Sequence, residues 1–240
     1  MIKAVTFDLW NTLFSNKDYS DLRIQYLMDV LGKQEIIRSY TEIKEAYIST
    51  HTYAYEVWKK ENHRHVSTEE RVNHILKKLH VELPKELEAI IVKEFKEFIL
   101  RDPPLLIEGV RETLEALSSK YKMGIISDTG FIPGYVIRKL LERHRILDLF
   151  ESTVFSDEIG FYKPHRLLFE TALRELEAEP SEAVHVGDLL QTDVAGAKAI
   201  GMKAIWVNRG GDARIESCSS DPDYEVNALP QVITIIEGLR

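Results

Sequence analysis

Five short apolar runs, spaced along the chain, constrain its fold more than any other feature. They are KAVTFD (3–8), KMGIISD (122–128), STVFSD (152–157), AVHVGD (183–188) and KAIWVN (203–208). Each is rich in β-branched residues and ends at a polar or turn residue, which is typical of a strand buried on both faces. Amphipathic segments with helical spacing accompany them, at 110–121, 135–144, 165–177 and 193–201. Strands that alternate with helices predict an α/β fold with a doubly wound parallel sheet.

Residues 18–101 have a different texture, because their apolar positions recur at helical spacing without a strand-like run. We predict about four helices, with Gly32, Ser67 and Pro84 near their junctions. The expected apolar faces are Leu22, Tyr26, Leu27 and Val30; Ile75, Leu76 and Leu79; and Leu87, Ile90, Ile91, Phe95 and Phe98. RDPPLL (101–106) cannot continue a helix and is interpreted as a hinge. The predicted domains are therefore a core, 1–15 plus 105–240, and an inserted helical module, 16–104.

Composition narrows the classes of function. The 240 residues carry 31 Lys and Arg against 39 Asp and Glu, a net charge of −8 with no basic run, which argues against a nucleic-acid partner. Cys218 is the only cysteine, so we expect no disulfide and no cysteine-ligated metal, and interpret it as a bystander thiol. The chain reaches Asp8 before any signal-peptide core and has no run near the ~20 apolar residues of a membrane span. We expect a cytoplasmic protein, monomeric or homodimeric, without a membrane partner.

Acidic side chains follow several of the predicted strands. Asp8 ends the first run, Ser127 and Asp128 end the second, and Asp188 ends the fourth, with Asp193 five residues later at the expected start of a helix. The carboxyl ends of parallel strands meet at one edge of a sheet, where ligands usually bind. This concentration of carboxylates predicts a site for a divalent cation.

Four segments resemble the motifs of the haloacid dehalogenase superfamily, in the order in which that family carries them. They are FDLWNTLF (7–14), IISDTG (125–130), YKPH (162–165) and VGDLLQTD (186–193). The helical module between the first two motifs resembles the all-helical cap domain of the family, which is inserted into a Rossmann-like core. The resemblance covers most of the chain and implies a Mg²⁺-dependent hydrolase of small phosphorylated metabolites.

The resemblance also implies a role for each motif residue. Asp8 would be the nucleophile that forms an aspartyl-phosphate, and Lys163 and Ser127 would hold the phosphoryl oxygens and offset their charge. Asp188 would bind the metal directly, and Asp193 would be a second ligand or an outer-shell partner. The phosphate-binding site would further include Thr12, Trp10 and Asp128, and the metal would also contact Asp8 and the Trp10 carbonyl.

One position departs from the phosphatase pattern. Such enzymes carry a second Asp two residues after the nucleophile, as general acid and base, whereas this chain has Trp10. An indole N–H cannot shuttle a proton at neutral pH, so a contribution typically worth ~10² to 10⁴ in rate is missing. Asp128 also stands where many relatives have Asn.

Three alternatives follow from Trp10. A 2-haloacid dehalogenase has an aromatic residue there and places an early cap arginine over the halide, for which Arg23 and Arg38 are available, but it uses no metal. An enzyme like phosphonoacetaldehyde hydrolase needs a Schiff-base lysine from the cap, such as Lys44, Lys59 or Lys60. A non-catalytic phosphate-binding module needs neither.

The segment HTYAYEVWKKENHRH (51–65) has two interpretations. It could form a lid that stacks on an aromatic or sugar-like leaving group. The interpretation we favour is an amphipathic helix with Tyr53, Val57 and Trp58 inside the helical module and with solvated histidines.

Overall fold

A computed structural model describes residues 1–210 and 221–239 of the chain. Its centre is a six-stranded parallel sheet in the order β3-β2-β1-β4-β5-β6. The strands are β1 (Ala4–Phe7), β2 (Lys122–Ser127), β3 (Ser152–Phe155), β4 (Ala183–Gly187), β5 (Lys203–Val207) and β6 (Tyr224–Val226). The doubly wound α/β class is confirmed, and each predicted run contains a strand. Cys218 lies outside the described residues.

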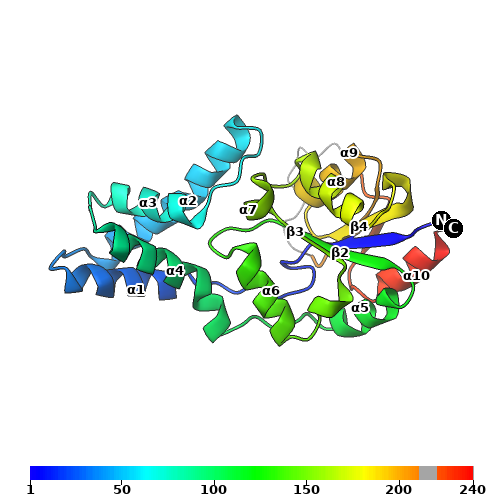
Figure 1. The fold of residues 1–240 in the computed structure, drawn as a ribbon, viewed down its shortest axis with the longest axis horizontal. Helices are drawn as coiled ribbons and strands as arrows, with labels where there is room; N and C mark the ends of the chain where they lie inside the picture. The colour runs from blue at the N-terminus through cyan, green and yellow to red at the C-terminus, as the bar shows by residue number, and fades with distance from the viewer. Residues whose placement is uncertain (211–220, 240) are drawn as a thin grey trace.

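Helices cover both faces of the sheet (Figure 1). One face packs against α5 (Val110–Ser118), α6 (Gly134–Arg143) and α10 (Gln231–Gly238). The other packs against α8 (Arg166–Glu175) and α9 (Ala195–Ala199). Short elements complete the core: α7 (Ser156–Ile159), 3₁₀ turns at Leu147–Leu149 and Pro180–Glu182, and a π-helical turn at Leu190–Val194.

Some predicted boundaries were wrong. The third strand ends at Phe155, because Ser156 and Asp157 already belong to α7. The last predicted helix begins at the π turn, so Asp193 lies inside this turn instead of starting the helix. Neither β6 nor α10 was predicted. β6 has only three residues, which are too few to show the sequence pattern of a strand.

Residues 20–101 form four helices, which we call the helical insertion: α1 (Ser20–Lys33), α2 (Tyr40–Lys60), α3 (Thr68–Lys78) and α4 (Lys85–Arg101). It extends to one side of the sheet and contains no strand (Figure 1). Ser67 caps α3: its hydroxyl accepts a hydrogen bond from the Glu70 N–H, and the Glu70 carboxylate accepts one from the Ser67 N–H. Pro84 precedes α4. The sequence SxxE is the usual signal for this cap. Gly32 lies in the last turn of α1.

Most residues of the expected apolar faces are buried or half-buried, with two exceptions. Leu22 is 48% exposed and Ile90 is 52% exposed, because both lie at the edge of their helix face, whereas Ile24 and Ile91 point inward. None of the described helices has the length and apolar character needed to cross a membrane.

The helical insertion contacts the core at further places besides its two linkers. The loop between α2 and α3 pairs with the loop after α7: the Tyr162 N–H donates to the His63 carbonyl at 2.7 Å, and the His65 N–H donates to the Gly160 carbonyl at 2.9 Å. Phe131, in the loop after β2, stacks on Tyr47 of α2 with ring centroids 5.2 Å apart. The insertion is therefore docked directly on the segment that precedes Lys163.

Candidate active site

Three carboxylates meet at the carboxyl edge of the sheet. Asp8 follows β1, Asp188 follows β4, and Asp193 comes from the π turn, and one oxygen of each lies within 4.8 Å of the other two. Asp8 and Asp193 are buried, whereas Asp188 is partly exposed. The two strands are neighbours in the sheet, which explains why residues 180 positions apart meet here.

Lys163 occupies the centre of this cluster. Its ammonium donates to Asp8 Oδ1 and to Asp193 Oδ1, both at 2.6 Å, and to the Ile126 carbonyl at 3.1 Å. Its backbone N–H donates to Asp128 Oδ1 at 2.8 Å. The Lys163 side chain is only 3% exposed, so these charge-assisted bonds act in a medium of low polarity.

The charged groups of the cluster shift one another's pKa values. Burial acts against the charge of Lys163, but Asp193 and Asp8 outweigh it and raise its pKa above the ordinary value. Burial likewise opposes the charge of Asp193, yet Lys163 and His185 bring its pKa well below the usual range. Burial raises the pKa of Asp8. Burial raises the pKa of Asp188 to about 7, with Asp8 and Asp193 adding to the effect. A cation beside Asp188 would remove this excess of negative charge.

A cavity of about 320 Å³ opens above the acids. Five of the predicted site residues line it: Asp8, Trp10, Asp128, Lys163 and Asp188. Burial raises the pKa of Asp128, one of these residues, to about 7.

Two predicted phosphate-binding residues lie behind the cavity wall. Thr12 and Ser127 are fully buried. The Ser127 hydroxyl donates to the Asp128 carbonyl at 3.3 Å. Thr12 Oγ1 has no hydrogen-bond partner among the described residues. Their phosphate-binding roles stay predictions.

Other groups that shape the site were not predicted. Arg209 donates to the carbonyls of Asn11 and Thr12, the latter at 3.3 Å, and so braces the loop after Asp8. The indole of Trp206 donates to the Asp188 carbonyl at 2.8 Å. These residues come from β5 and the loop after it, where nothing in the local pattern distinguishes them from packing residues.

Asn16, Lys17 and Tyr19, in the segment that leads into α1, also line the cavity. No residue of 51–65 lines the cavity, so the lid interpretation gains no support. The solvated interpretation was also wrong in part. His65 is buried against Ser156, with Nδ1 and Oγ 3.1 Å apart, and the Trp58 indole donates to the Lys163 carbonyl at 3.0 Å.

The basic residues proposed for the alternative reactions lie elsewhere. Lys44, Lys59 and Lys60 are exposed, and none of them lines the cavity. Arg23 is buried and donates to the Phe95 carbonyl from Nε and Nη2 at 3.1 and 3.0 Å. Arg38 donates to the Leu79 carbonyl, away from the acids.

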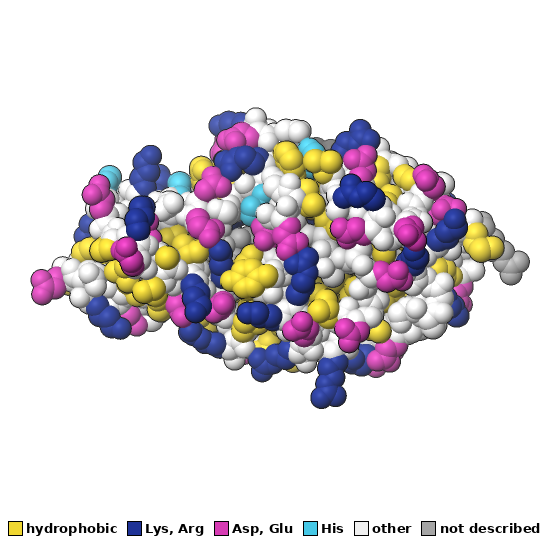
Figure 2. Space-filling view, in the orientation of Figure 1, with side chains coloured by type: hydrophobic (Ala, Val, Ile, Leu, Met, Phe, Trp, Pro, Cys, Tyr) yellow, Lys and Arg dark blue, Asp and Glu magenta, His cyan; other side chains and the backbone are white. Residues whose placement is uncertain are grey.

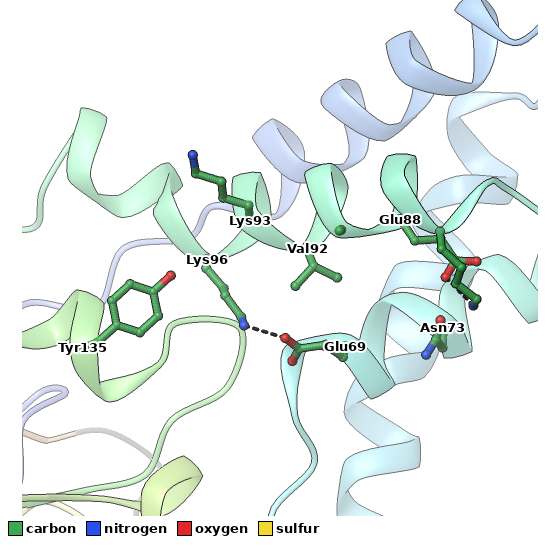
Figure 3. A pocket seen from close by; sticks show the side chains of 9 residues that line it. Glu69, Asn73, Glu88, Val92, Lys93, Lys96 and Tyr135 are labelled. Atoms are coloured by element: carbon green, nitrogen blue, oxygen red, sulfur yellow. Dashed lines mark hydrogen bonds and ion pairs between the residues drawn. The ribbon is translucent and has the colours of Figure 1, made fainter.

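A second cavity, of about 360 Å³, lies between α3, α4 and α6 (Figure 3). Lys96 and Glu69 form an ion pair of 2.6 Å across it, with Tyr135 beside them. It contains no group of the acidic cluster.

On the visible surface, basic and acidic side chains are interspersed and form no continuous basic face (Figure 2).

Comparison with known proteins agrees with this geometry. The family described as haloacid dehalogenase-like hydrolase matches residues 2–201. The chain belongs to this family.

Relatives within the haloacid dehalogenase-like hydrolases include a glyceraldehyde 3-phosphate phosphatase of Pyrococcus furiosus, 35% identical over 69% of this chain and 68% of the relative. Among solved structures, a phosphatase of the family from Thermococcus onnurineus is 29% identical, with a TM-score of 0.67 and 99% of both chains covered. A 2-haloacid dehalogenase from Pseudomonas syringae is 26% identical, with a TM-score of 0.75 over all of both chains. The predicted enzyme class, a hydrolase of this family, is confirmed.

Proposed function

We propose that this chain is a Mg²⁺-dependent phosphatase of small phosphorylated metabolites, with Asp8 as its nucleophile. The observation that carries the proposal is the position of Lys163 Nζ, 2.6 Å from both Asp8 and Asp193, with Asp188 completing the acidic cluster. A dehalogenase that works without metal has no need for this cluster. The relatives named as phosphatases support the same choice.

The donor set of the site fits a magnesium ion, which prefers carboxylate and carbonyl oxygens. Asp8, Asp188 and the Trp10 carbonyl would hold it. Both oxygens of Asp193 already accept bonds, Oδ1 from Lys163 and His185 and Oδ2 from the Leu189 N–H, so we place Asp193 in the outer shell. When bound, the ion would offset the repulsion between the Asp8 carboxylate and the phosphate dianion.

In the proposed reaction Asp8 attacks the phosphorus atom, a new P–O bond forms to its carboxylate, and the bond to the leaving alcohol breaks with both electrons on oxygen. Water then attacks the aspartyl-phosphate, releases inorganic phosphate and restores Asp8. Lys163 would balance the charge of the transferring oxygens. A proton must still reach the leaving oxygen, because Trp10 offers none.

The size of the cavity favours small substrates. A volume of about 320 Å³ holds a phosphate and a short carbon chain. We propose three-carbon phosphorylated aldehydes as the first class to test, since several relatives are named as glyceraldehyde 3-phosphate phosphatases. The division into a core (1–15 and 105–240) and a helical cap (16–104), and a monomeric or homodimeric state, remain predictions.

The test is release of inorganic phosphate from an aryl phosphate and from glyceraldehyde 3-phosphate, with Mg²⁺ and with a chelator. We expect activity only with the metal, and a loss of at least ~10³-fold in Asp8→Asn, which removes the nucleophile. Glu158→Gln, a substitution away from the cavity, serves as the control. Turnover in chelator, or turnover that survives Asp8→Asn, contradicts the proposal.

A 2-haloacid dehalogenase is the second candidate, favoured by Trp10 and by the similarity to the Pseudomonas syringae enzyme. Halide release from short 2-haloacids in the presence of chelator would replace the phosphatase proposal with this one.

A further inference from the structure

Two polar side chains lie beneath the acids, inside strands that are otherwise apolar on this face. Thr6 of β1 and His185 of β4 are 0% and 1% exposed and are register partners in the sheet. Because side chains alternate along a strand, Thr6 and Asp8 lie on one face, as do His185 and Gly187. This face is covered by α8 and α9, and the apolar residues packed on it include Leu168, Phe169 and Ala197.

The two side chains connect to the acidic cluster by hydrogen bonds. Thr6 Oγ1 and His185 Nδ1 lie 2.9 Å apart, and His185 Nε2 lies 3.3 Å from Asp193 Oδ1. An ionised carboxylate accepts and cannot donate, so the proton of this second bond is on Nε2. In the tautomer with Nδ1 unprotonated, Nδ1 accepts from the Thr6 hydroxyl, which also lies 3.5 Å from the Val184 carbonyl. Phe169 of α8 packs edge-on against the imidazole, with ring centroids 5.2 Å apart.

The arrangement costs stability unless every bond is made. A buried polar group without a partner costs about 1–3 kcal/mol, whereas valine at either position would pack without that requirement. The bonds converge on one carboxylate, and that carboxylate is the one that shares Lys163 with Asp8. The pair therefore does more than fill the core.

We propose that Thr6 and His185 are positioning residues. The Thr6 hydroxyl fixes the imidazole, and the imidazole N–H holds the Asp193 carboxylate in the orientation that places Lys163 Nζ against Asp8. Gly187 makes this possible, because a Cβ there would lie 2.4 Å from Asp193 Cγ. The consequence for turnover rests on the proposed function, whereas the hydrogen-bonded arrangement does not.

The arrangement is tested first by NMR on the wild-type protein labelled with ¹⁵N. Long-range ¹H–¹⁵N correlations of the His185 ring report which nitrogen carries the proton. We expect the Nε2–H tautomer, assigned by comparison with His185→Gln. A ring with its proton on Nδ1 alone would overturn the proposal, and this result needs no enzymatic activity.

Kinetics then test the consequence. His185→Leu removes the donor, and we expect kcat for phosphate release to fall about 10- to 100-fold with little change in KM. A loss of this size is typical when a residue that orients a functional side chain by a hydrogen bond is removed. His185→Gln can place its amide nitrogen near the position of Nε2, and we expect it to recover most of the loss. Thr6→Val should lose about 3- to 10-fold and Thr6→Ser little.

Thr113→Val is the matched control, since Thr113 is a buried hydroxyl of the same core that bonds only the Gly109 carbonyl, away from the site. Equal losses in His185→Leu and His185→Gln at matched melting temperature would overturn the positioning role, as would unchanged kcat in His185→Leu. If Asp8→Asn were as active as wild type, the proposed function would fail instead, and the tautomer would still decide the arrangement.

Discussion

We expect Trp10 to limit which leaving groups the proposed phosphatase can expel. The indole lines the cavity and packs near Phe14, with ring centroids 6.5 Å apart, and it has no proton to give at neutral pH. Catalytic efficiency should therefore fall steeply from aryl or acyl phosphates to alkyl phosphates. Trp10→Asp should flatten this dependence, because a carboxyl group protonates poor leaving groups selectively.

The measurement is the logarithm of kcat/KM against the pKa of the leaving group, for both proteins. A shallow slope in the wild type would show that another group supplies the proton. Asp128 would then be the first residue to substitute, since it is a titratable residue that lines the same cavity.

Gly187 should tolerate no side chain. An added Cβ would meet Asp193 Cγ and Cβ at 2.4 and 2.5 Å, so Gly187→Ala must displace the carboxylate that binds Lys163. We expect a loss of about 1–3 kcal/mol in the free energy of unfolding, together with a large loss of kcat. Denaturant unfolding and phosphate release measure the two effects.

Gly32→Ala is the control for that experiment, because a Cβ at Gly32 meets nothing within 4 Å. In the last turn of α1 it should be neutral or stabilising by up to about 1 kcal/mol. Similar losses in both variants would mean that the close approach at Gly187 is not what matters.

Among the elements, the loop between α2 and α3 should make stability depend on pH through His65. Burial, with Arg71 adding to it, lowers the pKa of His65 to about 4. The unfolded chain, with an ordinary pKa near 6.5, binds the proton first as pH falls, so this contribution is complete above pH 6.5 and is lost towards pH 4. Between pH 7.5 and 5 it amounts to about 2 kcal/mol.

The test compares the free energy of unfolding of wild type and His65→Asn at both pH values, because Asn does not titrate. We expect the variant to lose less on acidification by roughly 2 kcal/mol. His80→Asn removes an exposed histidine and should leave the wild-type difference unchanged. A parallel response of wild type and His65→Asn would refute the assignment.

At the scale of helices and strands, most features that depend on local sequence pattern were predicted from the sequence. The five longer strands follow from short β-branched apolar runs, and the helices of the insertion follow from periodicity, each signal being contained within a few residues. Ser67, one of the predicted junctions, is the cap of α3. The burial of Arg23 and His65 was missed, because it depends on partners such as Phe95 and Ser156 that lie 72 and 91 positions away. The acids were found because strand ends of a parallel sheet must meet, whereas the relay through Thr6 and His185 looks like an ordinary strand.

For the whole molecule, Phe131 should hold the helical insertion against the core. The ring is buried and stacks on Tyr47, and its centroid lies 4.8 Å from the guanidinium carbon of Arg23 and 5.4 Å from that of Arg71. Phe131→Ala should lower the free energy of unfolding by about 3–5 kcal/mol, and it should also loosen the contact between the helical insertion and the core. Small-angle scattering should then show a larger radius of gyration.

Phe150→Ala provides the comparison, since Phe150 is a buried core phenylalanine away from the insertion. It should lower stability without enlarging the molecule. If both variants kept the wild-type radius, the contacts at Tyr162 and His65 would suffice to hold the insertion in place.

The order of the strands also has a consequence during synthesis on the ribosome. β1 is made first, but it lies between β2 and β4, so its second neighbour emerges only after Ala183 has been added. At about 5–20 residues per second, this strand waits roughly 9–35 s with at least one edge open. The four helices of the insertion rely on nearby contacts and can fold meanwhile. A nascent chain that carries a folded helical body beside a bare Val5 and Phe7 is therefore the species that a chaperone would meet.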